Sequence, residues 1–205
     1  MWINEVFESI QGEGRLAGVP SFFIRTSGCN LRCSWCDTPE TSWRPTGGEW
    51  ARNELVERAS SCRCEHVVVT GGEPLLQAPA LARLLELLPD VTVEIETNGT
   101  TKANPSLDIR IDQFNVSPKL AHSGNPADLA LIPERLDAYA TDPRAWVKFV
   151  IAEPAEETQA PSQEPRRTYS NYRAGAYPPG GWRAFAGRSV LELTGPPEST
   201  ACALV

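Results

Sequence analysis

Short apolar runs and amphipathic segments alternate along residues 1–151 of the chain. The run His66–Thr70 is apolar almost throughout, which predicts a strand buried on both faces, as in a parallel sheet. Leucines recur at helical spacing between Pro79 and Leu88, and Pro79 suits a helix start. Further strands are predicted at 21–26, 91–97, 114–116 and 146–151, and further helices at 53–60 and 127–139.

Strands separated by helical segments indicate βαβ units, and therefore an α/β fold with a parallel sheet. In such folds, ligand-binding residues gather at the carboxyl ends of the strands. Two motifs occupy such positions, since Gly71–Pro74 follows the strand at 66–70 and Ser117–Lys119 follows the strand at 114–116. The predicted fold thus points to one ligand-binding edge of the sheet.

Composition and charge narrow the class of protein. The chain has 205 residues, of which 41% are hydrophobic and 22% are charged, values typical of a globular protein. No apolar run approaches the roughly 18 residues of a membrane span, and the start has no secretory signal pattern, so a cytoplasmic location is expected. The net charge of −7 and the lack of a Lys/Arg run disfavour nucleic-acid binding.

Three cysteines form the most informative motif, because Cys29, Cys33 and Cys36 follow a predicted strand with the spacing C-x3-C-x2-C. Thiolates suit iron–sulfur clusters and zinc. A four-iron cluster held by three cysteines leaves one iron open to the amino and carboxylate groups of S-adenosylmethionine. This spacing resembles the signature of the radical S-adenosylmethionine superfamily.

The remaining cysteines leave an alternative open. Cys62 or Cys64 would be the fourth ligand if the three-cysteine loop bound zinc. Otherwise the two form a surface pair without a role. Cys202 stands alone near the end of the chain and is expected to have no special role.

Two motifs gain meaning beside the cysteine loop. The glycines of Gly71–Pro74 allow close approach to a ligand, and Glu73 offers an acceptor for the cofactor's ammonium group. Ser117–Lys119 offers a hydroxyl and a cation, although alone it is equally an ordinary strand-exit turn. Trp35 either shields the cluster and contacts the adenine or simply packs.

Taken together, several segments closely resemble 7-carboxy-7-deazaguanine synthase between about Ile3 and Ile151. The most specific is the segment SIQGEG, Ser9–Gly14, combined with the cysteine spacing. The others are Arg25, Asp37-Thr38, Gly71–Pro74, Glu96–Gly99, Ser117–Lys119 and Lys148–Val150.

The resemblance implies a partial (β/α)6-type radical S-adenosylmethionine barrel, incomplete at the C-terminus. The implied reaction contracts 6-carboxy-5,6,7,8-tetrahydropterin to 7-carboxy-7-deazaguanine with loss of ammonia, on the route to queuosine. A [4Fe–4S] cluster, S-adenosylmethionine and Mg²⁺ are the implied cofactors, and the cofactor rather than a catalytic side chain carries the radical chemistry. A homodimer and an electron donor such as flavodoxin are the implied partners.

The resemblance also assigns roles to residues. Cys29, Cys33 and Cys36 bind the cluster, and Thr38 binds Mg²⁺. The implied substrate-binding residues are Ile10, Gln11, Gly12, Glu13, Arg25 and Thr70. The implied cofactor-binding residues are Trp35, Cys36, Asp37, Gly72, Glu73, Ser117, Pro118 and Lys119. Arg25 suits a carboxylate bound through two hydrogen bonds, with a surface ion pair as its alternative role.

Residues 152–205 form a Pro-, Ala- and Arg-rich tail after the 1–151 core. The composition predicts loop or poor order, with a single strand candidate at Ser189–Leu193. The family continues with a helix–strand unit and a histidine-containing segment, whereas this chain has no histidine after His122. A frameshift is one hypothesis for this departure, which bears on the activity of this particular chain.

Two other functions are consistent with parts of the pattern. Another small radical S-adenosylmethionine enzyme, such as a glycyl-radical activase, needs the cysteine loop but not SIQGEG with Arg25. A non-catalytic zinc-binding module needs only the thiolates.

Overall fold

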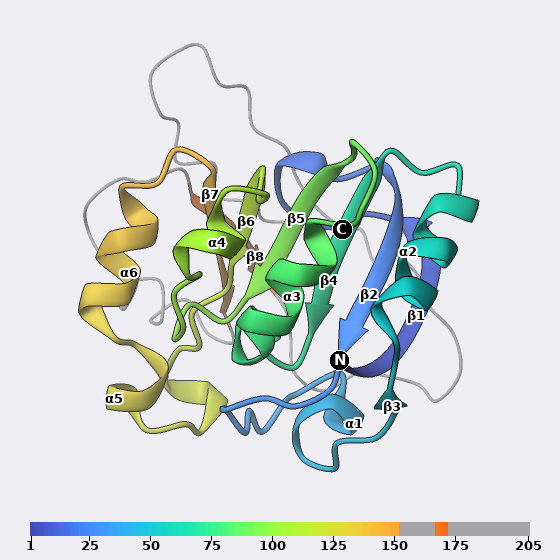
Figure 1. The fold of residues 1–205 in the computed structure, drawn as a ribbon. Helices are drawn as coiled ribbons and strands as arrows, with labels where there is room; N and C mark the ends of the chain where they lie inside the picture. Colours follow the sequence, from blue (N-terminus) through green and yellow to red (C-terminus); the bar gives the residue numbers. More distant parts are fainter. Residues whose placement is uncertain (152–166, 172–205) are drawn as a thin grey trace.

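The computed structural model describes residues 1–151 and 167–171. Its strands form an eight-stranded sheet in the order β3-β1-β2-β4-β5-β6-β7-β8 (Figure 1). The strands are β1 (Trp2–Ile10), β2 (Pro20–Thr26), β3 (Gly48–Glu49), β4 (His66–Gly71), β5 (Thr92–Thr97), β6 (Gln113–Val116), β7 (Ala145–Ile151) and β8 (Arg167–Asn171). From β2 to β8 neighbouring strands run parallel, whereas β1 is antiparallel to both β2 and β3. The order is linear, so the described strands form an open sheet.

Short helices connect the strands. The α-helices are α1 (Pro39–Ser42), α2 (Arg52–Ser61), α3 (Ala78–Leu85), α4 (Pro105–Asp108), α5 (Ala127–Ala130) and α6 (Pro133–Ala140). Three 3₁₀ turns are η1 (Gly14–Leu16), η2 (Pro74–Gln77) and η3 (Ala121–Ser123). Figure 1 shows α2, α3, α4 and α6 on the same face of the sheet. None of the helices in residues 1–151 is long and apolar enough to cross a membrane.

The α/β class and the parallel sheet are confirmed, with differences in detail. The helix expected at 127–139 is two helices, α5 and α6, and α6 begins at Pro133, where the proline ring suits a first turn but not a helix interior. The first strand, β1, precedes the first strand that the pattern predicts. β8 lies in the tail, pairs with β7 and stands where the sequence pattern predicts no strand. The strand candidate Ser189–Leu193 lies outside the described residues.

The sheet has one apolar face, and this face forms the core with the helices. Successive side chains of a strand point to opposite faces. On β4 and β5 the core residues are Val67, Val69, Val93 and Ile95, which are at most 1% exposed. α3 contributes Leu81, Leu84 and Leu85, the leucines predicted to form its buried stripe.

The opposite face of the same strands is polar and largely buried. Its buried members are Ser21, His66, Thr70, Glu94, Gln113 and Asn115, with Glu96 and Lys148 half-buried. Because buried polar groups are costly without partners, this face must carry its own hydrogen-bond network. The functional residues lie within this network.

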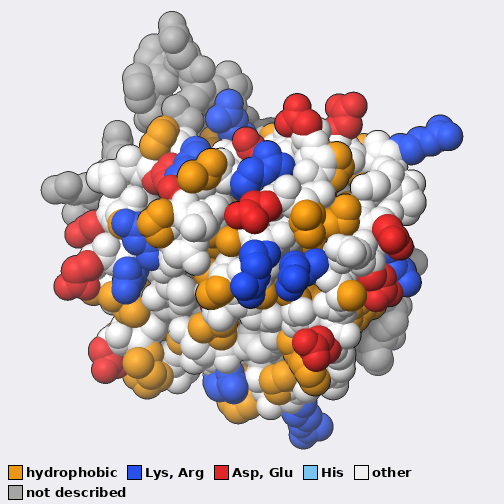
Figure 2. All heavy atoms as spheres, viewed as in Figure 1, with side chains coloured by type: hydrophobic (Ala, Val, Ile, Leu, Met, Phe, Trp, Pro, Cys, Tyr) orange, Lys and Arg blue, Asp and Glu red, His pale blue; other side chains and the backbone are white. Residues whose placement is uncertain are grey.

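Charges of both signs are mixed on the helix-covered side of the molecule. Figure 2, viewed as in Figure 1, shows Lys and Arg side chains interspersed with Asp and Glu. Among the residues that the structure describes, neither sign gathers into a continuous patch on this side, so their charges offer no surface suited to steering a highly charged ligand.

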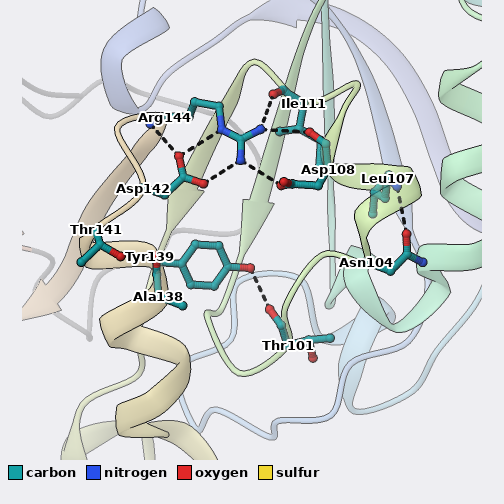
Figure 3. A network of polar contacts seen from close by, with 10 residues as sticks. All are labelled: Thr101, Asn104, Leu107, Asp108, Ile111, Ala138, Tyr139, Thr141, Asp142 and Arg144. Carbon is teal, nitrogen blue, oxygen red and sulfur yellow. Dashed lines mark hydrogen bonds and ion pairs between the residues drawn. The ribbon is translucent and has the colours of Figure 1, made fainter.

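Arg144 fastens the segment before β7 to the segment before β6 (Figure 3). Its guanidinium donates to both carboxylate oxygens of Asp142, at 3.0 and 2.7 Å, and to Asp108 Oδ1 at 2.9 Å. It also donates to the backbone carbonyls of Asp108 and Ile111, at 2.9 and 3.0 Å. Nearby, the hydroxyl of Tyr139 donates to the Thr101 carbonyl at 2.7 Å, which holds α6 against the chain after β5.

Replacing Arg144 by lysine tests this fastening. An ammonium keeps the charge but cannot reach the same set of acceptors as the planar guanidinium, so R144K is expected to lower the free energy of unfolding by about 1–3 kcal/mol. Urea denaturation followed by circular dichroism measures the loss. The matched control is R58K, because Arg58 and Glu54 form an exposed pair with atoms 3.9 Å apart, and its effect should stay within about 0.5 kcal/mol. Equal stability of R144K and the parent protein would contradict the prediction.

Candidate active site

The cysteine loop and three other loops meet at the carboxyl ends of the parallel strands. The cysteine loop follows β2, and Gly72–Pro74 follows β4. Asn98-Gly99 follows β5, and Ser117–Lys119 follows β6. Since β2, β4, β5 and β6 are consecutive parallel neighbours, these loops leave from the same edge of the sheet.

Two glycines allow the loop after β4 to touch the loop after β2. Gly71 has a φ of +128°, and a Cβ there would lie 2.1 Å from the carbonyl oxygen of Thr26. A Cβ on Gly72 would lie 2.3 Å from the Gly28 carbonyl oxygen. The backbone N–H of Glu73 donates to that same carbonyl at 2.9 Å. Only glycine allows this approach, which places the cysteine loop directly against the Gly71–Pro74 turn.

The three sulfurs of the cysteine loop are free thiols with polar neighbours. The backbone N–H of Leu31 donates to Cys29 Sγ at 3.4 Å, and Asn125 Nδ2 donates to Cys33 Sγ at 3.3 Å. The Ser42 hydroxyl lies 3.2 Å from Cys36 Sγ. Donors aimed at sulfur favour thiolates, and three thiolates on one loop fit an iron–sulfur cluster.

Burial opposes the thiolate form in the absence of added positive charge. It raises the pKa of Cys29 and Cys33, while the nearby Lys119 lowers both values. A cationic metal centre supplies the charge that such thiolates need. The cysteine loop therefore suits a cluster better than three unligated thiols.

Cys62 and Cys64 take no part in this loop. They lie between the end of α2 and the start of β4, at the amino edge of the sheet, whereas Cys29 follows the carboxyl end of β2. The structure joins Cys62 and Cys64 by a disulfide. Neither can therefore complete a zinc site with the three-cysteine loop, so that alternative is wrong.

Asn98 ties the end of β5 to the cysteine loop. Its side-chain amide donates to Asn30 Oδ1 at 3.0 Å, and its oxygen accepts from the Thr100 hydroxyl at 2.6 Å. Asn30 in turn donates to the Thr100 hydroxyl at 2.7 Å. This ring of three side chains orients the loop that carries Cys29.

Glu73 holds the turn after β4 on the end of β5. It is fully buried and accepts from the Thr97 hydroxyl at 2.9 Å, from the Asn98 N–H at 2.8 Å and from the Leu75 N–H at 3.1 Å. Burial raises its pKa to about 7, although these hydrogen bonds oppose the shift. The sequence predicts Glu73 as a cofactor acceptor, and the structure adds this structural role.

A second group, here called the interior cluster, lies on the polar face beside the loops. It consists of Gln11, Glu13, Thr70, Glu96 and Lys148, and Glu94 lies beside it on β5. Glu96 accepts from the Thr70 hydroxyl at 2.6 Å and from Gln11 Nε2 at 3.0 Å. Lys148 pairs with Glu13. These contacts bring together three of the predicted substrate residues, Gln11, Glu13 and Thr70.

The carboxylates of the interior cluster titrate differently. Burial would raise the pKa of Glu13, but Lys148 and Lys119 lower it below its ordinary value. Burial and the charge of Glu13 raise the pKa of Glu96. Burial and the charge of Glu96 raise that of Glu94 to about 9, so Glu94 is a neutral acid at pH 7. The cluster therefore holds one ionic pair beside neutral donors and acceptors.

The other predicted substrate residues lie at the margin. Arg25 faces Thr70 across β2 and β4, but its Nε donates to Glu5 at 2.8 Å and its guanidinium lies over the Phe7 ring. The structure thus shows the ion pair given as its alternative role. Ile10 is 62% exposed, and Gly12 has open space around it.

The predicted cofactor residues form a shell around the cysteine loop. Lys119 donates to the Ser117 hydroxyl at 2.9 Å and lies 5.4 Å from the centre of the Trp35 ring. Trp35 stacks on His122, with ring centres 5.3 Å apart. Pro118, which lies between Ser117 and Lys119 in the sequence, is buried. Burial and Lys148 lower the pKa of Lys119.

The two residues after Cys36 lie at the outer rim of the loop. Asp37 is exposed, and the Thr38 hydroxyl donates to Asp37 Oδ1 at 3.4 Å. Thr38 precedes α1, so its hydroxyl stands where the loop turns into a helix.

Comparison with known proteins decides the family. Residues 23–121 match the radical SAM superfamily. The 7-carboxy-7-deazaguanine synthase of Halobacterium salinarum is 41% identical over 177 residues, which cover 75% of this chain and 65% of that protein. Its namesake from Pyrobaculum aerophilum is 41% identical over 163 residues, which cover 77% of this chain and 70% of that protein. The chain belongs to the 7-carboxy-7-deazaguanine synthase family.

A solved structure agrees with this assignment. The crystal structure of QueE from Escherichia coli superposes with a TM-score of 0.55 at 25% identity, covering 82% of this chain and 81% of that one. The family resemblance carried by SIQGEG and the cysteine spacing is confirmed, as is the radical S-adenosylmethionine fold. Superfamily membership implies a [4Fe–4S] cluster and S-adenosylmethionine.

In this member of the 7-carboxy-7-deazaguanine synthase family, several site residues carry no obvious sequence signal. The sequence analysis did not single out Glu94, Asn115 and Asn125, and it named Glu96, Asn98 and Lys148 only as parts of the family-like segments Glu96–Gly99 and Lys148–Val150. Glu94 and Glu96 alternate with Val93 and Ile95, a pattern that also fits an ordinary half-exposed strand. One signal could have found them. β5 lies between β4 and β6, and both of these neighbouring strands also carry polar side chains.

Removing the Glu73 carboxylate tests its role as a fastening between β4 and β5. E73A leaves the Thr97 hydroxyl and the Asn98 N–H buried without their acceptor, so the free energy of unfolding should fall by about 2–4 kcal/mol. Urea denaturation followed by circular dichroism measures the change. The matched control is E57A on the exposed surface of α2, which should shift stability by less than about 0.5 kcal/mol. Equal effects of the two substitutions would refute the role.

Proposed function

We propose that this chain catalyses the radical S-adenosylmethionine ring contraction of 6-carboxy-5,6,7,8-tetrahydropterin to 7-carboxy-7-deazaguanine, with loss of ammonia. The observation that carries the proposal is the contact between the cysteine loop and the Gly71–Pro74 turn, beside the interior cluster. Family membership supports the same reaction, because the relatives bear the name of this activity. The carbon–nitrogen lyase reaction belongs to deazapurine and queuosine biosynthesis.

Cys29, Cys33 and Cys36 would hold the cluster, and the loops after β4 and β6 would hold S-adenosylmethionine. When bound, this pair would supply a 5′-deoxyadenosyl radical for hydrogen abstraction from the pterin. Gly72 lets the turn after β4 pack against the Gly28 carbonyl, which would bring the backbone of this turn to the cofactor's methionine end. Lys119 and Ser117 offer a cation and a hydroxyl at the neighbouring strand end.

The interior cluster would hold the substrate. A pterin ring carries an amide and an amino-substituted nitrogen edge, which require acceptors and donors placed side by side. Glu96 and Gln11 provide such a pair, joined at 3.0 Å. Arg25 or Lys148 would bind the pterin carboxylate. Each now contacts a protein carboxylate, Glu5 or Glu13, whose place the substrate carboxylate would take. Ile10, Gly12 and Thr70 complete the proposed substrate-binding segment.

Four finer points stay predictions, the first three from the family resemblance and the last from the sequence pattern. They are Mg²⁺ bound through Thr38, a homodimer, an electron donor such as flavodoxin, and a cytoplasmic location. Mg²⁺ prefers oxygen ligands and retains water, so the Thr38 hydroxyl at the rim of the loop is chemically reasonable as a ligand. The division into a 1–151 core and a 152–205 tail also stays a prediction.

Turnover of the pterin tests the proposed function. The cluster is reconstituted anaerobically, and reductant, S-adenosylmethionine, Mg²⁺ and 6-carboxytetrahydropterin are added. Mass spectrometry should detect 7-carboxy-7-deazaguanine together with 5′-deoxyadenosine. Formation of 5′-deoxyadenosine without the deazaguanine would contradict this substrate, and would favour another radical S-adenosylmethionine enzyme such as a glycyl-radical activase.

Cysteine variants provide the internal control for this experiment. C33A should lose iron, sulfide and both products, because it removes one of three cluster ligands. C62S should keep them, because Cys62 lies at the opposite edge of the sheet. Zinc in place of iron and sulfide in the parent protein would instead indicate a non-catalytic zinc module.

A further inference from the structure

Glu94 is a buried carboxyl group that the proposed reaction does not use. Its side chain is 0% exposed and lies on the polar face, next to Glu96 along β5. One oxygen, Oε1, accepts from Gln11 Nε2 and from Asn115 Nδ2, the latter at 2.8 Å. The other oxygen, Oε2, has no hydrogen-bond partner among the described residues. A buried acid so placed needs an explanation.

The Oε1 contacts join the 11–19 loop to the sheet. Gln11 begins this loop after β1, and Asn115 lies on β6. The loop also touches Asn115 directly, since a Cβ on Gly14 would lie 2.1 Å from Asn115 Oδ1. Asn115 Oδ1 accepts in turn from Gln113 Nε2 at 3.2 Å, so it is held in place from the sheet. One oxygen of Glu94 thus binds both sides of the contact between loop and sheet.

The Oε2 side leads to the other end of the same loop. His66 Nε2 lies 3.6 Å from Glu94 Oε2, and His66 Nδ1 lies 2.7 Å from the Ser21 hydroxyl. That hydroxyl donates to the Val19 carbonyl at 2.8 Å. Val19 closes the loop, because its carbonyl also accepts from the Gln11 N–H at 2.9 Å. Glu94 therefore lies between the two ends of the 11–19 loop.

The donors in this chain determine where the protons are. When the Ser21 hydroxyl donates to Val19, His66 Nδ1 donates to Ser21, and in the neutral imidazole, which burial favours, the Nε2 lone pair faces Glu94. Two lone pairs facing each other repel, so Glu94 Oε2 carries the proton. Burial, which raises the pKa of Glu94 and lowers that of His66, agrees with this arrangement.

We propose that Glu94 is a positioning residue that, as a neutral acid, holds both ends of the 11–19 loop on the sheet and fixes the side-chain amide of Gln11. Nε2 of Gln11 donates to Glu94 and to Glu96, so the side-chain amide has a fixed orientation. Its Oε1 then accepts from the Glu13 N–H at 3.1 Å. The orientation of one predicted substrate contact is thereby set before substrate binds. The consequence for catalysis rests on the proposed function, whereas the loop fastening does not.

Three variants test the proposal in the cluster-loaded protein. E94Q copies a neutral acid, because its amide keeps an acceptor for Gln11 and a donor for His66. E94L removes both. V93A is the matched control, since Val93 is equally buried but lies on the opposite, apolar face of the same strand. If E94L does not fold, E94D replaces it, because the shorter side chain withdraws the oxygens from Gln11 without deleting the carboxyl group.

Hydrogen exchange of the 11–19 loop gives the readout that is independent of activity. The backbone N–H of Gln11 donates to the Val19 carbonyl at 2.9 Å, and the backbone N–H of Gly18 donates to the Gln11 carbonyl at 2.7 Å. E94L should raise their exchange at least about tenfold, while E94Q and V93A stay within about twofold of the parent protein. In turnover, E94L should raise KM for the pterin about tenfold or more, with a smaller change in kcat.

Three results would overturn the proposal. E94L with parent-like loop exchange would show that the carboxyl does not hold the loop. E94Q as damaging as E94L would show that Glu94 acts through its charge. V93A with the same loop exchange as E94L would show a general loosening of β5. Absence of pterin turnover in the parent protein would instead count against the proposed function, and the exchange experiment would still decide the role of Glu94.

Discussion

The close contact between the Gly71-Gly72 turn and the end of β2 is the constraint on which the site depends. The Thr26 and Gly28 carbonyls approach these glycines so closely that no side chain fits. This contact fixes the distance between the first two parallel strands where they end. Because the cysteine loop leaves from one strand and the Gly71–Pro74 turn from the other, the same contact places thiolates beside a backbone able to approach a cofactor. The Glu73 carboxyl extends the fastening to β5.

The sheet separates stability from chemistry by using its two faces differently. The helix-covered face carries the valines, isoleucines and leucines that exclude water and stabilise the fold. The other face is also buried, but it is filled with side chains that hydrogen-bond one another, which makes it selective for polar ligands. Such a face is costly unless its polar groups find partners, so the interior cluster depends on neighbouring side chains that hydrogen-bond to it. Glu94, Asn115 and His66 belong to this supporting set.

The strongest local signals predicted the parts of the fold that depend on local sequence. The leucine spacing of α3, the apolar run of β4 and the cysteine spacing each report a geometry that neighbouring residues determine. The split between α5 and α6 was missed although Pro133 marked it, because the apolar pattern continues across the proline. β1 was missed because its apolar and polar residues alternate weakly, and β8 was missed because it is a short strand at the edge of the sheet.

The candidate site was predictable where motifs lie in single loops and not where contacts cross the sheet. Gln11, Glu13 and Thr70 were chosen by family resemblance, and the structure brings them together. Glu96 and Lys148 meet them only through strand order and register, which pattern alone does not provide. The pairing of Arg25 with Glu5 likewise depends on the antiparallel register of β1 and β2.

In the proposed function, the cysteine loop and the interior cluster serve one reaction space at the carboxyl edge of the sheet. The most direct measurement supplies 6-carboxytetrahydropterin deuterated at its ring carbons to the reconstituted protein and determines the isotopic content of the 5′-deoxyadenosine formed. Deuterium in the 5′-deoxyadenosine is the predicted result, because the radical would then have taken hydrogen from a pterin bound within reach of the cofactor. Unlabelled 5′-deoxyadenosine would contradict the claim, since the radical would have formed without the pterin in contact.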